Sequence, residues 1–435
     1  LLSLSPFQKN RLKHLSLIQY FTGINVSIYF LTKSNNKYSL FDKNSTIEPL
    51  IHYSDEYEIK IIHNLVAKKI LTFLTGLTDE NLLHQKIKEL SLSLLDFIDT
   101  EFPSDKNNKN ILEIINSLFI RRKIKLYDTD STNNMNRHYT ELLDKTSIDD
   151  REEIFIKLIN IYPENSHFLA HFGRFYSVDR KNITFALDYI DKAISISEKE
   201  NTEGQHDSIL YHIKGMVYFR EILQRKEINN IELDEIIKLA KEALHYFNLS
   251  LEYDTQSNND YPYISSAKLI LTVLRVGKEK YGTLDGFLNE HKNDSFVESL
   301  IDNINEIISE FKELNNNDED ITFFDMESIE NQLFELYENY SSALSSLYNN
   351  LSTNNFNNHI IKRTIVRLTI KKFNNDVNNI EVKKVNNLIS FLEENLNNVD
   401  NDVSSSDLLL FLRLIRHNNC NYDLLKTLEI EKRKT

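Results

Sequence analysis

The chain has 435 residues and a hydrophobic content of 41%, enough for two or three domains with buried cores. Its formal net charge of -14 argues against a general affinity for nucleic acid, because phosphate binding needs clustered Lys and Arg. The single cysteine, Cys420, excludes an internal disulfide and a cysteine-rich metal site, and no apolar run is long enough to cross a bilayer. We therefore expect a cytoplasmic protein.

Glycine and proline are scarce, at 8 and 5 residues. Rossmann folds, phosphate loops and β-sandwiches need glycine where the backbone takes positive φ or approaches closely, whereas long helices do not. The composition therefore predicts a mainly α protein. The sequence also begins at Leu1 rather than at a methionine, which suggests an internal piece of a longer protein.

Residues 1–75 combine helices with a β-hairpin. Helical spacing of apolar residues and two short strand-like runs predict, in order, helices over Phe7–Tyr20 and Val26–Leu31, strands over Ile47–Tyr53 and Tyr57–Ile62, and a helix over Asn64–Leu74. Helix, helix, hairpin and helix are the elements of a winged-helix domain. We predict that fold for residues 1–75, followed by a helical linker over residues 76–150.

An internal repeat lies between Tyr162 and Asp254. Leu169, Gly173 and Tyr176 occupy the fourth, eighth and eleventh places of a tetratricopeptide (TPR) repeat, and Ala186, Ile190 and Ala193 fit its second helix, after a turn one residue longer than usual. A second copy has the same features at Tyr211, Gly215, Tyr218, Ala243, Phe247 and Ser250, with a longer segment between its helices. Such helix pairs bury their apolar faces by stacking, so we predict a TPR-like α-solenoid over residues 151–280. Residues 281–435 are predicted to form a helical C-terminal extension.

The repeat residues themselves specify packing rather than function. Counting from the motif, five side chains on the first helices should face the concave surface: His167, Arg174, His212, Met216 and Arg220. They are our candidate contacts to a protein partner, although exposed polar residues on a helix are more often simply solvated.

The sequence holds no recognisable catalytic motif. The nearest approach to a phosphate loop, Gly277–Lys278, lacks the upstream glycine and the following Ser or Thr, and we predict a helix terminus there. Asp318–Asp320 do not have the spacing of a calcium loop, and Cys420 has no positioned base beside it. We therefore predict no catalytic residues, no metal and no cofactor in this chain.

Two charged segments occur near the C-terminus. Glu290–Glu338 is strongly acidic, whereas α-helical spacing places five bases together without intervening acids: Lys362, Arg363, Arg367, Lys371 and Lys372. The two segments could pair with each other, guide a partner, or simply be solvated.

The repeat segments HFLAHFGRFYS, IDKAISIS and IKGMVYF, with IIHNLVAKKIL and FIRRK (Phe119–Lys123), resemble the TPR-like region of bacterial STAND NTPases. These are signal-transducing ATPases organised like NOD-like receptors, and several act in antiviral defence. The resemblance covers roughly residues 57–254 and implies that a nucleotide-binding module lies upstream, where ATP or ADP would bind.

In that family a histidine that opens the last winged-helix helix contacts the nucleotide phosphates in the resting state. His63 occupies the matching place, although Asn64 stands where the family triplet ends in Asp. An imidazole can donate a hydrogen bond to a phosphate. The alternative is a histidine that caps the helix or packs between strand and helix.

The resemblance implies the sensor region of a STAND-type protein, whose repeats bind a protein ligand such as a viral protein and whose full-length form can oligomerise. The alternatives are a free-standing TPR scaffold or adaptor without an NTPase, and an RNA-binding repeat protein that uses the basic segment near Lys371. An upstream phosphate loop would distinguish the first from the second.

Overall fold

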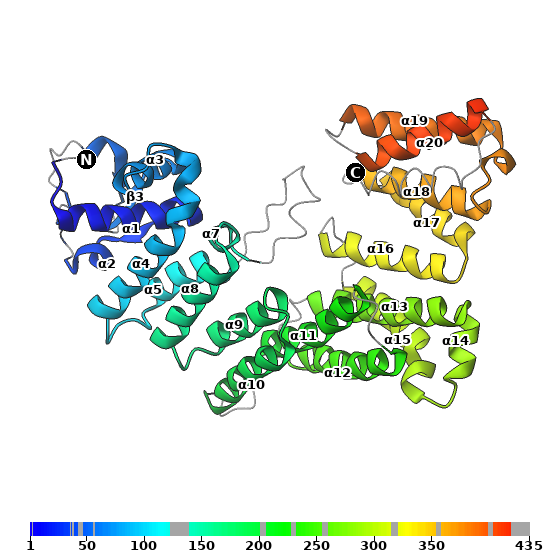
Figure 1. Ribbon diagram of the computed structural model, residues 1–435, viewed down its shortest axis with the longest axis horizontal. Helices are drawn as coiled ribbons and strands as arrows, with labels where there is room; N and C mark the ends of the chain where they lie inside the picture. Colours follow the sequence, from blue (N-terminus) through cyan, green and yellow to red (C-terminus); the bar gives the residue numbers. More distant parts are fainter. Residues whose placement is uncertain are drawn as a thin grey trace. The chain divides into compact units, whose positions relative to one another are not determined.

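The computed structural model describes residues 1–418 apart from residues 2, 35, 37–38, 42–46, 55–56, 122–138, 201–205, 228–231, 255–259, 315–320, 354–357 and 399–402. The chain, drawn in Figure 1, is divided into two compact units, residues 1–206 and residues 207–435. Arg122, Lys123, Asp318–Asp320 and Cys420 lie outside the described residues. The division falls within the range 151–280 predicted for the repeats, so the two repeat copies belong to different units.

The first unit is helical apart from a small sheet. Its helices are α1 (Pro6–Thr22), α2 (Ile28–Thr32), α3 (Asn64–Leu74), α4 (Ile87–Glu101), α5 (Lys109–Ile115), α7 (Glu141–Asp144), α8 (Ile148–Ile161), α9 (Ser166–Val178) and α10 (Ile183–Glu200). Short 3-10 helices cover Glu48–Leu50 and Glu80–Lys86, and a π-helical turn covers Asn116–Ile120. One apolar core runs from α1 to α9.

The sheet contains β1 (Val26–Ser27), β2 (Ile51–Tyr53) and β3 (Glu58–Ile61), in the order β1-β3-β2 and antiparallel throughout. The prediction of a helix over the whole of Val26–Leu31 was wrong at its first two residues. Val26 pairs with Ile59 inside the sheet and is buried, and a β-branched side chain in this setting favours a strand. The helix predicted over Asn64–Leu74 is confirmed as α3.

Local sequence explains where the first helix begins and ends. Ser5 and Gln8 form a capping box: the Gln8 N–H donates to Ser5 Oγ (3.2 Å) and the Ser5 N–H donates to Gln8 Oε1 (3.0 Å). Pro6 at the first helical position has no N–H to leave unsatisfied. Gly23 ends α1 with φ of 68°, a conformation that glycine adopts without strain.

The second unit is described only as helices. They are α11 (Ser208–Glu227), α12 (Leu233–Glu252), α13 (Tyr261–Tyr281), α14 (Leu284–Glu290), α15 (Ser295–Leu314), α16 (Ile321–Leu336), α17 (Tyr340–Thr353), α18 (Asn358–Lys372), α19 (Val382–Asn398) and α20 (Val403–Asn418), with a 3-10 turn at Val377–Asn379. Successive helices pack as pairs around two apolar cores, one from α11 to α16 and one from α17 to α20. The predicted mainly α, TPR-like fold is therefore confirmed.

The predicted helix terminus at Gly277 was wrong. Gly277 is buried inside α13, four residues before the helix ends. A Cβ at this position would lie 2.4 Å from the ring of Phe287 on α14, so the glycine allows that ring to approach the helix. In the described part of the chain, no helix is long and apolar enough to span a membrane.

Candidate partner-binding surface and the His63 position

The repeat register is set by a glycine in each first helix. A Cβ on Gly173 of α9 would lie 2.7 Å from Ile190 Cγ1 and 2.8 Å from the Ala186 carbonyl oxygen of α10. A Cβ on Gly215 of α11 would lie 2.6 Å from the Phe247 ring of α12. These approaches join the residues that the sequence motif paired, so the two repeats have the predicted helix-to-helix contacts.

Arg174 does not occupy the exposed position that motif counting gave it. Its side chain is only 6% exposed, and its guanidinium carbon lies 5.7 Å from the centroid of the Tyr139 ring. Tyr139 comes from the segment before α8, which the repeat motif does not include. Counting along a helix cannot show what another segment covers, and a partner could reach little of Arg174 in this structure.

The other candidate contacts are half-buried. His167 lies in the first turn of α9, and His212, Met216 and Arg220 follow one another at four-residue spacing on α11. His212 Nε2 lies 3.0 Å from Ser265 Oγ of α13, so the next first helix covers part of this face. Met216 packs against the core of its unit. Only part of each of these four side chains is therefore open to a partner, because the rest is covered by the protein itself.

In both repeats the last motif tyrosine of the first helix stacks on a partly exposed tyrosine of the second helix that motif counting did not single out. In the first repeat Tyr176 stacks on Tyr189, with ring centroids 5.8 Å apart and planes 12° apart. In the second repeat Tyr218 stacks on Tyr246 at 5.8 Å and 0°. In each pair, the tyrosine of the first helix lies three residues after the repeat glycine. The tyrosine of the second helix directly precedes the residue that the glycine contacts, Ile190 or Phe247. The same repeat register could therefore have revealed both pairs.

The first tyrosine pair extends to an exposed ring. Phe185, at the start of α10, stacks on Tyr176 at 5.3 Å and is 50% exposed. The Tyr176 hydroxyl donates to Glu152 Oε1 of α8 (2.7 Å), which fixes the ring that supports Phe185. We call Tyr176, Phe185 and Tyr189 the aromatic ledge.

A buried arginine ties the linker to the first repeat. Arg151 of α8 donates through Nη1 to Asp179 Oδ2 (2.5 Å) at the end of α9, and through Nε and Nη2 to the Leu143 and Thr146 carbonyls (both 3.1 Å). All three acceptors are satisfied by one fixed fork of donors. The arrangement holds α9 against the chain that precedes α8.

His63 is exposed and is the N-cap of α3. Its Nδ1 accepts a hydrogen bond from the Leu65 backbone N–H (3.1 Å), so the capping interpretation is what the structure shows. In the neutral ring this acceptor role places the proton on Nε2. An exposed Nε2–H is the donor that a phosphate oxygen would accept from, so capping and phosphate contact are compatible.

Exposed apolar side chains adjoin His63 in the sequence. Ile62 precedes the histidine and is 52% exposed, and Leu65 follows it and is 60% exposed. Phe73 is also exposed, but it lies near the other end of α3, about 12 Å along the helix axis from Leu65. Ile62 and Leu65 offer apolar surface beside His63 for contact with another protein module.

The basic helix α18 is paired mainly within its own unit. Lys371 and Arg367 both form ion pairs with Glu335, which belongs to the acidic segment, and Lys362 pairs with Glu394. Lys372 Nζ donates to Ser341 Oγ (2.8 Å). Of the three interpretations of the charged segments, pairing within the chain is the one that these contacts support, which weakens the RNA-binding alternative.

No protein-family model matches the sequence, and no curated protein matches it. Among solved structures, the chain is similar to a Signal Transduction ATPase with Numerous Domains (STAND) protein with a tetratricopeptide repeat sensor from Pyrococcus horikoshii, at 14% identity and a TM-score of 0.24. The match covers 95% of this chain and 60% of that one.

Proposed function

We propose that this chain is the sensor region of a STAND-type signalling NTPase in antiviral defence and that its helical repeats bind a protein ligand of viral origin. The aromatic ledge is the observation that supports the protein-binding part of the proposal. A half-exposed phenylalanine on a fixed tyrosine pair offers apolar area at little entropic cost, which is the character of residues that dominate protein interfaces. Lysine side chains flank the stacked tyrosines of both repeats: Lys192 lies over Tyr189 and Lys214 over Tyr246.

The proposal also gives residues 1–75 the role of a winged-helix relay. The three-stranded sheet, with α1 before it and α3 after it, supports this assignment. His63 would donate from Nε2 to the phosphate of a nucleotide held by an upstream module, and the exposed Leu65 and Phe73 would pack against that module. Ligand binding to the repeats would favour an open arrangement over the resting one by differential affinity.

Partner capture tests the sensor role. The purified chain is used as bait in lysates of cells before and after phage exposure, and a partner should be retained from the exposed cells. Phe185→Ser should abolish the capture, because it removes the exposed ring of the aromatic ledge. Phe73→Ser is the matched control: its ring is similarly exposed but lies on α3. Equal capture by both variants and the unaltered chain would contradict the proposed surface.

Two further measurements separate the STAND proposal from a free-standing TPR scaffold. The gene upstream of the Leu1 codon should encode a phosphate loop, a motif that the scaffold alternative does not need. The chain by itself should neither bind nor hydrolyse ATP, because its sequence contains no phosphate-cradling loop. Micromolar ATP binding by calorimetry would show that this part of the reasoning is mistaken.

A further inference from the structure

The connection between α16 and α17, residues 337–339, is short and strained (Figure 1). Glu338 at its centre has φ of 60°, the left-handed conformation that glycine usually supplies at the end of a helix. The Glu338 N–H donates to the Glu335 carbonyl (3.0 Å), and the Asn339 N–H donates to the Phe334 carbonyl (2.8 Å). These are the two hydrogen bonds of a Schellman cap, so a glutamate occupies the position where that cap favours glycine.

A lysine from an earlier helix holds the bend. Lys278 Nζ of α13 donates to the Leu336 carbonyl (2.9 Å) and to Glu338 Oε1 (2.9 Å). It satisfies one of the carbonyls that the end of α16 leaves without a helical partner, and it pairs with the strained glutamate. The bend therefore depends on a contact from outside the two helices that it joins.

The sequence of α16 and α17 is that of one uninterrupted helix. Residues 321–353 contain no glycine and no proline, the residues that most often end a helix. Apolar residues recur at alternating spacings of three and four on both sides of the bend, which is the heptad pattern of one helix face. They are Met326, Ile329, Leu333, Leu336, Tyr340, Ala343 and Leu347. Local sequence therefore favours a straight helix here.

The bend divides this apolar face between two cores. The apolar residues of α16 pack in the core of α11–α16, and those of α17 pack in the core of α17–α20, which we call the C-terminal core. At the boundary, Phe334 of α16 packs partly buried against the C-terminal core. Glu335 forms ion pairs with Arg367 and Lys371 of α18. Boundaries within a chain that contain such polar contacts separate more readily than large hydrophobic ones.

We propose that the C-terminal core exchanges between two copies of this chain. In the exchanged dimer, residues 337–339 join α16 and α17 into one straight helix, and the C-terminal core of each copy packs on α16 of the other. The ion pair between Glu335 and Lys371 then forms between the copies, so the contacts at the boundary are those of the monomer. The exchange uses neither the aromatic ledge nor His63, and it does not depend on the proposed function.

The gain of the exchange lies in the connection itself. Glu338 leaves its left-handed conformation, and the backbone of residues 337–339 gains the hydrogen bonds of a continuous helix. Short hinges under strain are the ones that favour exchange between copies. The loss is the pair of contacts from Lys278, which therefore sets the balance between monomer and dimer.

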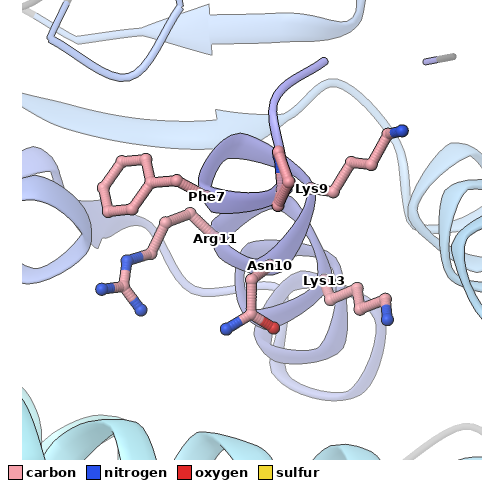
Figure 2. Close-up of a pocket in the computed structure, with 6 residues that line it drawn as sticks. Phe7, Lys9, Asn10, Arg11 and Lys13 are labelled. Atoms are coloured by element: carbon pink, nitrogen blue, oxygen red, sulfur yellow. The ribbon is translucent and has the colours of Figure 1, made fainter. Parts of the chain in front are cut away.

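Refolding the full 435-residue chain from urea over a series of protein concentrations tests the exchange, because the hinge can then close within one copy or between two. Light scattering after size-exclusion chromatography should show a dimer fraction that rises with concentration. Lys278→Met should lower the dimer Kd by about ten-fold, because it removes both contacts that hold the bend. Lys13→Met is the matched control: Lys13 extends from α1 in the first unit (Figure 2), and its loss should change the Kd by less than about two-fold.

Glycine at the bend should have the opposite effect. Glu338→Gly removes the left-handed strain of the bent connection and lowers the helix propensity of the straight one. Both changes favour the monomer, so the dimer Kd should rise by about ten-fold.

Crosslinking identifies the segment that is exchanged. Unlabelled and nitrogen-15-labelled copies are refolded together, and a carbodiimide joins Glu335 to Lys371 where these side chains pair. In the dimer fraction this crosslink should include pairs of mixed isotopes, whereas a dimer that forms elsewhere gives only unmixed pairs. Three results would each overturn the proposal: a monomer at every concentration for both the unaltered chain and Lys278→Met, a dimer without mixed crosslinks, or a Glu338→Gly chain that dimerises as tightly as the unaltered one.

Discussion

The glycine contacts of the two repeats make a prediction that the structure sharpens. At Gly173 and Gly215, a Cβ would lie 2.6 to 2.8 Å from its nearest neighbours, well inside the 3.4–4 Å of ordinary van der Waals contact. Gly173→Leu and Gly215→Leu should therefore each lower the free energy of unfolding by about 1 to 3 kcal/mol, the usual cost of overpacking. Thr184→Leu, an exposed position on α10, is the size-matched control and should change it by less than about 0.5 kcal/mol.

Rescue by a second substitution should differ between the two sites. The nearest obstacle at Gly215 is the Phe247 ring, with the Ala243 carbonyl farther away at 3.0 Å, so Phe247→Leu should recover part of the stability lost by Gly215→Ala. At Gly173 the backbone carbonyl of Ala186 lies at 2.8 Å and cannot rotate away, so Ile190→Ala should recover less of the loss in Gly173→Ala. Neighbouring substitutions commonly couple by about 0.5 to 3 kcal/mol, which is measurable.

Urea unfolding combined with hydrogen exchange is the suitable assay, because the two glycines lie in different units. Lost protection should be confined to α9 and α10 for Gly173 variants and to α11 and α12 for Gly215 variants. Wild-type unfolding of both leucine variants would mean that the helices do not approach at the glycines and that the repeat register is wrong.

Three further predictions follow from single side chains. His63→Ala in the full-length protein should raise ligand-independent activation by about ten-fold or more, because the hydrogen bond from His63 to the nucleotide phosphate is lost. If the substitution instead destabilises the isolated chain and leaves basal activity unchanged, His63 is only the N-cap of α3. Burial and the neighbouring Arg11 and Lys13 lower the pKa of His14 to about 3 in the folded protein. Between about pH 6.5 and 3, His14 is therefore protonated in the unfolded chain but neutral in the folded one. Stability of the first unit should therefore fall as pH falls through that window, and the same titration of His14→Gln should lack this contribution. Arg151→Met should cost about 3 to 5 kcal/mol in chemical denaturation, because it strands Asp179 in a largely buried position, and a cost below about 1 kcal/mol would contradict the role of this arginine as a tie.

The sequence by itself determined the helical class and the repeat register. Scarce glycine and helical apolar spacing favoured α structure, and the repeated spacing of Gly173 and Gly215 with their second-helix partners is confirmed by the close contacts. These features were readable because each depends on neighbours within one helix pair. The limits of the α3 helix were readable for the same reason, since capping is local.

Only the tertiary structure decided what covers each surface. Val26 forms a strand because Ile59, distant in sequence, pairs with it, and Arg174 is buried with Tyr139, a residue of another segment, among its neighbours. Gly277 lies inside a helix, where its missing Cβ leaves room for the Phe287 ring, a contact that the local sequence does not reveal. The burial of Arg11 between elements far apart in the chain is of the same kind. Local patterns carry propensity and periodicity, whereas burial and charge compensation depend on contacts between segments that no local pattern brings together.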